Sequence, residues 1–154
     1  MPKCDILSIG AGMRRHPGAI HCDKRPLPGI DVVHDLNSYP WPFESGWASR
    51  VIAFDVLEHL DDVIRAVEEC HRILRMGGTL WIHTNYWNTK QAFTDPTHKH
   101  FFTEESFDFF CPGTFLGDNY GFYSACKFRK IEWHMEATEM VMTLIKTDGG
   151  HGHA

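Results

Sequence analysis

The feature that most restricts the fold is a glycine-containing turn at the end of a short apolar run near the start of the chain. The run from Cys4 to Ile9 leads into Gly10-Ala11-Gly12, and a second apolar run, from Ala19 to Asp23, ends in an acid. Short apolar runs between turns are typical of strands that are buried on both faces. Glycine directly after such a strand lets the backbone approach a ligand closely. We therefore expect a buried parallel sheet with a ligand site beyond the ends of its strands.

Later apolar runs continue the same pattern. Further strands are predicted over Asp31 to His34, Arg50 to Val56 and Thr79 to Tyr86. Near the C-terminal end, Phe128 to Glu136 and Glu139 to Lys146 are β-rich runs joined by a short turn, which predicts an antiparallel pair. Strands that alternate with short connections and a helix favour an α/β fold of Rossmann type. The expected fold is therefore a mostly parallel sheet with an antiparallel C-terminal strand and some shortened helices.

Helices are expected in two of the connections. Asp61-Asp62 provides an N-cap, and the helix that follows is predicted to end near Gly77, where a glycine suits a left-handed cap. Its predicted buried stripe consists of Ile64, Val67, His71 and Leu74. A second, short helix is predicted from Thr103 to Phe110. The connection between the first two strands has room for only about two helical turns. We therefore expect the helical layer on this side of the sheet to be reduced.

Length and composition are those of a globular domain. The chain has 154 residues, 43% of them hydrophobic and 23% charged, so we expect one domain over residues 1–148 and a flexible tail at residues 149–154. The formal net charge of −5 offers no general attraction to a nucleic-acid backbone. The 5 scattered cysteines form no C-x-x-C pair, and no apolar run is long enough for a membrane span. These features predict a cytoplasmic protein that does not contact a membrane.

The glycine turn lacks the features that bind phosphate. A dinucleotide-binding turn needs a third glycine where this chain has Arg15, and no Gly-Lys pair of a Walker loop occurs in the sequence. A nicotinamide-dependent oxidoreductase is thereby weakened as an alternative. Two acids, Asp23 and Asp35, end successive strands at the same sheet edge, where a carboxylate can accept hydrogen bonds from a ribose. Together these residues predict a ligand that contains a nucleoside without a phosphate.

Five segments carry a resemblance to a known family. In chain order they are SIGAG, HCD, VVHDLNSYPWPF, AFDVLEHL and HRILRMGG. Their order and spacing resemble the class I S-adenosylmethionine-dependent methyltransferases, and most of all the small methyltransferase-type-11-like subfamily. The resemblance is close from Ile6 to about Thr84 and loose over the rest of the chain. It implies a transferase with a Rossmann-like fold that uses S-adenosylmethionine and releases S-adenosylhomocysteine.

The resemblance also implies which residues contact the cofactor. They are Gly10, Ala11, Gly12, Asp23, Asp35, Leu36, Phe54 and Asp55. The glycine turn would pass under the methionine part, and Asp23 would hold the ribose hydroxyls. Asp35 and the backbone of Leu36 would meet the adenine, while Phe54 and Asp55 would lie beside the sulfonium and the methionine amine. The chain departs from the family pattern at Ser8, where an acid is common, and this puts one contact to the cofactor amine in doubt.

Two histidines are candidates for a catalytic role at the molecule that accepts the methyl group. His59 lies in DVLEHL, and His98 lies in the segment FTDPTHKHFFTEESF, which is expected to form a loop above the fifth strand. Histidine titrates near neutral pH and suits general-base catalysis, so His59 and His98 are the predicted catalytic residues. Either one can instead hold a loop in place by hydrogen bonding, and that alternative stays open.

A second resemblance concerns a metal. Glu58-His59 with the downstream DPTHKHFFT segment resembles the small-RNA 2′-O-methyltransferases, in which acids and histidines of these two segments hold a divalent metal. The matching ligands here would be Asp55, Glu58, His59 and either His98 or His100. A metal lowers the pKa of a bound hydroxyl, which would suit transfer to a ribose. The acidic net charge argues against RNA, so the presence of a metal is left open.

The predicted function is transfer of a methyl group from S-adenosylmethionine to an acceptor that the sequence does not identify. The resemblance favours a small molecule or a sugar-like hydroxyl as this acceptor. Two alternatives stay open, namely a non-catalytic methyltransferase-like partner subunit and a metal-assisted RNA ribose 2′-O-methyltransferase. The sequence gives no indication of the oligomeric state.

Overall fold

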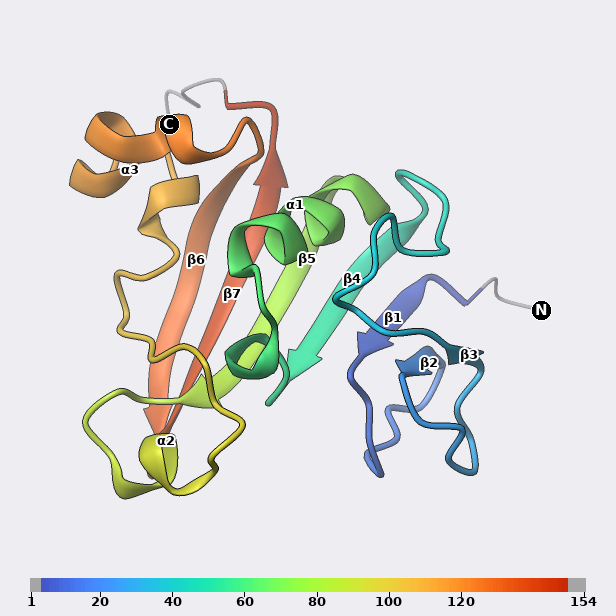
Figure 1. The fold of residues 1–154 in the computed structure, drawn as a ribbon. Helices are drawn as coiled ribbons and strands as arrows, with labels where there is room; N and C mark the ends of the chain where they lie inside the picture. Colours follow the sequence, from blue (N-terminus) through green and yellow to red (C-terminus); the bar gives the residue numbers. More distant parts are fainter. Residues whose placement is uncertain (1–3, 150–154) are drawn as a thin grey trace.

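Seven strands form one sheet in the computed structural model, which describes residues 4–149 (Figure 1). They are β1 (Ile6–Ile9), β2 (Ala19–Asp23), β3 (Val32–Val33), β4 (Ala48–Phe54), β5 (Leu74–Asn85), β6 (Lys127–Glu136) and β7 (Glu139–Thr147). Their order across the sheet is β3-β2-β1-β4-β5-β7-β6. The first five are parallel, whereas β7 is antiparallel to both β5 and β6. This confirms the predicted fold class.

The central strands carry the apolar core on one face. Leu7 and Ile9 of β1, Val51 and Ala53 of β4, and Ile82 of β5 share this face and are almost completely inaccessible to solvent. These alternating apolar positions lie in short, mostly apolar runs, which is why the strands could be predicted. Because the strands β1 to β5 are parallel, their carboxyl ends meet at one edge of the sheet. This edge is where open α/β sheets bind ligands.

The α-helix α1 (Val63–Ile73) covers one face of the sheet beside β4 and β5 (Figure 1). It begins where predicted, because the side chain of Asp62 accepts a hydrogen bond from the backbone N–H of Arg65 at 2.9 Å. Its buried residues are Ala66, Val67, Cys70 and Ile73. Small side chains at two of these positions allow the helix to pack closely on the sheet. The core of this layer is therefore built on a stripe that only partly matches the predicted one.

Three predictions for this helix were wrong. Ile64 is exposed, and His71 is half-buried at the helix edge, where its Nε2 meets the backbone carbonyls of Lys127 and Thr147. Gly77 does not cap the helix, because the chain is already extended from Leu74 onward and Gly77 lies inside β5. Its φ of 77° is nevertheless in the left-handed region that favours glycine.

The segment between β5 and β6 holds only short helices. They are α2 (Lys90–Thr94), η2 (Asp108–Phe110), α3 (Phe115–Tyr120) and η3 (Gly121–Tyr123). The helix predicted from Thr103 to Phe110 is reduced to turns and the single turn η2. The Ser106 hydroxyl accepts from the Thr103 N–H at 2.8 Å, and the Thr103 hydroxyl accepts from the Glu105 N–H at 3.2 Å. These local bonds satisfy the amides without a continuing helix.

The connections on the β3 side of the sheet are short. Between β1 and β2, and between β2 and β3, the chain forms turns and no helix. The sequence predicted at most about two helical turns between β1 and β2. The structure has no helix there, so the helical layer on this side of the sheet is reduced further than expected. Of the predicted tail, Gly149 is described, whereas residues 150–154 lie outside the described residues. Across residues 4–149, no helix combines the length and the apolar character that a membrane crossing needs.

Candidate functional site

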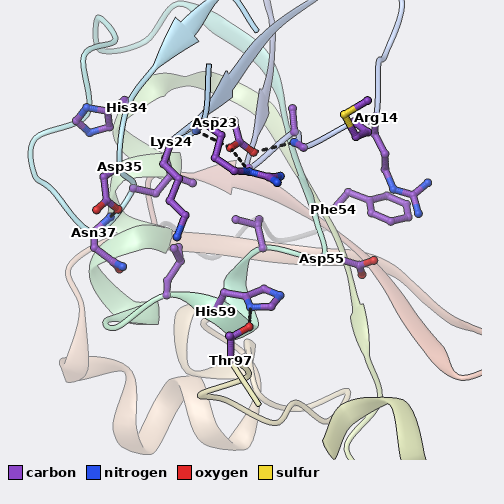
Figure 2. Close-up of a pocket in the computed structure, with 18 of the residues that line it drawn as sticks. Arg14, Asp23, Lys24, His34, Asp35, Asn37, Phe54, Asp55, His59 and Thr97 are labelled. Carbon is purple, nitrogen blue, oxygen red and sulfur yellow. Dashed lines mark hydrogen bonds and ion pairs between the residues drawn. The ribbon is translucent and has the colours of Figure 1, made fainter. Parts of the chain in front are cut away.

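A cavity of about 1140 Å³ opens at the carboxyl ends of β1, β2 and β4. Every residue predicted to contact the cofactor lines it: Gly10, Ala11, Gly12, Asp23, Asp35, Leu36, Phe54 and Asp55. Figure 2 shows Asp35 toward one end of this group, Phe54 and Asp55 toward the other, and Asp23 between them. The structure therefore brings the predicted residues together in one place. Their contact with a cofactor stays a prediction.

The glycine turn after β1 requires glycine at its first position. Gly10 has a φ of 57°, a left-handed conformation that other residues rarely adopt. A Cβ atom there would lie 2.3 Å from the Cγ2 atom of Val56, which is buried just beyond β4. Gly12 has a φ of 54°, but a Cβ atom there would meet nothing closer than 3.7 Å. The turn is therefore shaped by backbone conformation at both glycines and by close packing at Gly10.

Asp23 joins the end of β2 to this turn. Its Oδ2 accepts a hydrogen bond from the Gly12 N–H at 2.8 Å, and its Oδ1 accepts one from the Arg25 N–H at 2.9 Å. Burial acts to raise the pKa of Asp23, but these bonds and the Arg25 guanidinium outweigh it and hold that pKa below its usual value. Asp23 is therefore an ionised carboxylate whose oxygens retain lone pairs for a ligand hydroxyl.

The adenine side predicted for the cavity is formed by the chain after β3. Asp35 is exposed, and its Oδ1 accepts a hydrogen bond from the Asn37 N–H at 2.9 Å. Leu36 is buried, and its carbonyl accepts from the Trp41 indole N–H at 3.0 Å. The Asp35 carboxylate is thus fixed at the cavity wall beside an apolar residue. This combination suits a flat heteroaromatic ring that carries an amino group.

The opposite end of the cavity is an aromatic and charged cluster at the end of β4. The Arg14 guanidinium lies 3.6 Å from the centre of the Phe54 ring, and the His83 ring stacks on Phe54 at 3.9 Å. The Nδ1 of His83 is 2.8 Å from the Oδ1 of Asp55. Asp55 has a φ of 49°, which is rare for a residue other than glycine and is typical of functional sites.

Arg14 and His83 were not among the predicted site residues. Arg14 was visible in the sequence only as part of a basic patch with Arg15, Lys24 and Arg25. His83 was visible as one polar residue inside the apolar run TLWIHT. Neither sequence feature shows what the side chain contacts. Arg14 and His83 both meet the end of β4, and these contacts form only when β1 and β5 pair with β4 in the sheet.

Glu58 is a buried acid whose carboxylate makes no hydrogen bond of ordinary geometry, although the Thr84 hydroxyl and the charge of His98 act to lower its pKa. It lies in the single turn η1 (Leu57–His59), its exposed fraction is 2%, and neither carboxylate oxygen has a hydrogen-bond partner among the described residues. Burial raises the pKa of Glu58 to about 7, and the nearby charge of Asp55 adds to the shift. Such a group is unusual, because buried carboxylates are normally paired or hydrogen-bonded.

Two histidine rings lie next to this acid. The His59 and His98 rings meet edge to face with their centres 4.7 Å apart. One ligand atom from each of Glu58, His59 and His98 can be chosen so that all three lie within 4.8 Å of one another. Asp55 and His100, which were predicted as possible metal ligands, do not belong to this group. The Nε2 of His100 instead donates to the Leu60 carbonyl at 2.8 Å and fixes the loop.

The two predicted catalytic residues differ in their relation to the cavity. His59 lines it, together with Thr97 from the facing loop (Figure 2). His98 does not line it and lies instead at a smaller cavity of about 450 Å³ beside α2. Both histidines also hold the loop by hydrogen bonds, as the alternative interpretation expected. The cavity rim also includes basic side chains, namely Arg14, Lys24, Arg25 and Lys99.

Part of the chain is similar in sequence to known methyltransferases. Residues 11–82 match the model of a family described as "Methyltransferase domain". A curated relative from Mycobacterium tuberculosis, "Probable S-adenosylmethionine-dependent methyltransferase Rv3030", is 31% identical over 102 residues. That alignment covers 54% of this chain and 37% of the relative, so the match spans just over a third of the curated relative's length.

Solved structures share the fold at low sequence identity. A SAM-dependent methyltransferase from Archaeoglobus fulgidus has a TM-score of 0.61 and 16% identity, covering 92% of this chain and 85% of that one. A chain from a complex of the Haloferax volcanii Trm112 methyltransferase activator with a methyltransferase has a TM-score of 0.66 and 11% identity. This match covers 92% of this chain and 81% of that one. At such identities the likeness concerns the fold alone.

Proposed function

We propose that this protein transfers the methyl group of S-adenosylmethionine to an acceptor, because residues 11–82 match the model of a methyltransferase domain family and the chain is similar to a curated S-adenosylmethionine-dependent methyltransferase. The observation that carries the proposal is the position of Asp23 and Asp35 on the wall of one cavity, beyond the glycine turn. The released product would be S-adenosylhomocysteine.

The residues that line the cavity fit this cofactor. Asp23 would accept hydrogen bonds from the ribose hydroxyls, and Asp35 would accept one from the adenine amino group. Ala11, within the glycine turn, and Leu36, next to Asp35, provide apolar surface on the cavity wall. Asp55 at the other end would attract the positive charge of the sulfonium or of the methionine amine. The site shows no phosphate cradle, and the proposed cofactor contains no phosphate.

When bound, the cofactor supplies a methyl group on a positively charged sulfur. The protein's main contribution would be alignment, because holding two reactants in line removes much of the entropic cost of their meeting. Carboxylates such as Asp55 would favour binding more than the reaction step, because the positive charge that they attract fades as the methyl group leaves. Two imidazoles line the cavity, and His34 lies at the Asp35 end, so His59 is the one that would contact the acceptor (Figure 2).

We propose a small molecule or a sugar-like hydroxyl as the acceptor. Arg25 and Lys99 at the cavity rim are ion-paired with Asp23 and Asp61. The positive charges of Arg14 and Lys24, which also line the cavity, would favour an acceptor that carries a negative group. The net charge of −5 argues against a long nucleic acid.

We also propose, from the length, the composition and the cysteine pattern of the sequence, that the protein is cytoplasmic and forms a single domain over residues 1–148.

Isothermal titration calorimetry with S-adenosylhomocysteine and, separately, with NAD tests the choice of cofactor. We expect one molecule of S-adenosylhomocysteine to bind per chain and NAD to give no heat of binding. Tight binding of NAD without binding of S-adenosylhomocysteine would overturn the proposal in favour of an oxidoreductase.

A radioactive methyl-transfer screen tests the acceptor. We expect label from the cofactor to enter a hydroxylated small molecule. Label in a ribose 2′-O position of a short RNA would instead identify the RNA methyltransferase alternative. Binding of S-adenosylhomocysteine without transfer to any acceptor would favour a non-catalytic partner subunit, an assembly of the kind named for the Haloferax volcanii structure.

A further inference from the structure

We propose that the second half of the edge strand β6 pairs with the same strand of a second copy of this chain, so that two sheets join into one across a two-fold axis. Among the described residues, β6 pairs with β7 on one side and with no strand on the other (Figure 1). The opposite edge of the sheet is β3, which has only 2 residues, whereas β6 has 10. A long unpaired edge is where a sheet can add a strand from another chain.

Only the second half of β6 is open to such a strand. In the first half, the Lys130 Nζ donates to the Glu104 carbonyl at 2.7 Å and lies 2.6 Å from the Oδ1 of Asp108, so the segment before α3 is fastened there. The pairing with β7 then skips Ile131, which forms a β-bulge. From Ile131 to Glu136, the described structure shows no hydrogen bond of the backbone outside the ladder with β7. The outward N–H and C=O groups of this stretch are therefore available to a second strand.

The open stretch carries apolar side chains that solvent reaches. Ile131, Trp133 and Met135 have exposed fractions of 47%, 43% and 40%. In the β6–β7 pairing, Trp133 lies opposite Met142 and Met135 lies opposite Met140, so both share a sheet face with fully buried residues. The apolar core thus continues to the edge of the sheet. From Ile131 to Glu136 there is also no lysine or proline, the residues that usually prevent an edge from pairing.

The side chains of this stretch are complementary to a second copy of themselves. A two-fold axis through an antiparallel pair places one residue opposite the same residue of the other chain. With the axis at Trp133, Glu132 of each chain lies opposite His134 of the other. Met135 of each chain then lies opposite Ile131 of the other. Pairs of acid with imidazole and of apolar with apolar side chains stabilise neighbouring strands, so this register favours a dimer.

Other registers lack this complementarity. With the axis at His134, Glu132 of each chain would lie opposite Glu136 of the other. With the axis at Glu132, the two Glu132 carboxylates would face each other. Like charges directly opposite each other destabilise a sheet. The charges of the edge therefore select the register that is centred on Trp133.

The proposed dimer leaves the cofactor cavity open. The cavity lies at the carboxyl ends of β1, β2 and β4, and the strands β5 and β7 separate β4 from β6. No residue from 131 to 136 lines the cavity. The dimer and the proposed methyl transfer are thus independent, and either can fail while the other holds.

Size-exclusion chromatography with light scattering, together with sedimentation velocity over a range of concentrations, tests the dimer. We expect the wild type to reach twice the mass of one chain as its concentration rises. Trp133→Lys places two positive charges opposite each other at the axis, so it should raise the dissociation constant of the dimer at least about tenfold. The matched control is Phe115→Lys, which changes a ring on α3 that is 75% exposed and should leave this constant unchanged. A monomer at every concentration, or a dimer that Trp133→Lys does not weaken, would overturn the inference.

An exchange of charges tests the register and does not depend on how well the Trp133 variant folds. Glu132→Lys removes the acid opposite His134 and should weaken the dimer about threefold or more. Glu132→Lys combined with His134→Glu should restore the dimer, because opposite charges again face each other. A dimer that is strengthened by Glu132→Lys alone would show that Glu132 faces an acid, which would overturn the pairing centred on Trp133. Binding of S-adenosylhomocysteine to Trp133→Lys reports on the proposed function separately.

Discussion

The carboxylate of Asp23 and the backbone amide of Gly12 are joined by a hydrogen bond of 2.8 Å between Oδ2 and N. This bond connects the acid at the end of β2 to the glycine turn after β1. A ligand that binds to the Asp23 carboxylate therefore binds to the same group that accepts a hydrogen bond from the glycine turn. The two features that the sequence suggested separately are one structural unit.

Replacing Asp23 should weaken cofactor binding. We expect Asp23→Ala to reduce the affinity for S-adenosylhomocysteine by about 1.5–3 kcal/mol, the usual loss for a charge-assisted hydrogen bond. Calorimetry measures the change. Glu44→Ala, at an exposed position outside the cavity lining, is the control and should bind like the wild type. An unchanged dissociation constant for Asp23→Ala would show that this acid does not touch the ribose.

Gly10→Ala should damage both the turn and the binding site. The left-handed φ costs about 1–2 kcal/mol for alanine, and the contact with Val56 adds about 1–3 kcal/mol. Gly46→Ala is the matched control, because Gly46 has a φ of 72° but no atom within 4 Å of the added Cβ. Chemical denaturation should show a larger loss of stability for Gly10→Ala than for Gly46→Ala. Equal losses would mean that the packing of Val56 on the turn is unimportant.

Asp55→Asn should change the preference between the two forms of the cofactor. Asparagine tolerates the left-handed φ of 49°, so the fold should persist while the charge is removed. S-adenosylmethionine carries a positive sulfur and S-adenosylhomocysteine does not. We expect the variant to lose about 1 kcal/mol more affinity for the first than for the second, at an effective dielectric typical of surfaces. Parallel calorimetric titrations measure this difference, and equal losses would place Asp55 away from the sulfonium.

Stability at acidic pH should depend on Glu69. Burial acts to raise the pKa of Glu69, but hydrogen bonds from Arg72 and from the Trp41 N–H, at 2.7 Å, outweigh it and lower that pKa. The lowered pKa means that the stabilisation is present above the unfolded value of about 4.5 and is lost as the pH falls through the folded value. We expect Glu69→Gln to lose about 1–2 kcal/mol at pH 7 and little at pH 3. Urea unfolding between pH 3 and pH 7 measures how the free energy of unfolding changes with pH. The same pH dependence in the wild type and in Glu69→Gln would contradict the stabilising role of the Glu69 carboxylate.

The sequence predicted most of the sheet and the cofactor cavity because both follow from short-range patterns. The strands β1, β2 and β4 are short runs with buried apolar residues, and each ends in a residue that lines the cavity or leads into the glycine turn. Parallel pairing then brings these ends to one edge without further information.

The parts that could not be predicted depend on contacts between distant segments. The helix α3 has no buried residue, so its sequence shows no apolar period. Ile64 fits the helical period of α1 but faces solvent, because close packing of the small residues Ala66 and Cys70 sets the rotation of the helix. His98 and His100 are equivalent in the sequence, and only the fold of the loop places His98 beside Glu58 and turns His100 toward the Leu60 carbonyl.

A crystal structure of the protein with S-adenosylhomocysteine would show where the nucleoside binds. We predict that it lies in the cavity beyond the glycine turn, with the ribose hydroxyls at hydrogen-bond distance from Asp23 and the adenine beside Asp35. S-adenosylhomocysteine bound elsewhere on the molecule, with this cavity free of it, would show that Asp23 and Asp35 do not hold the cofactor.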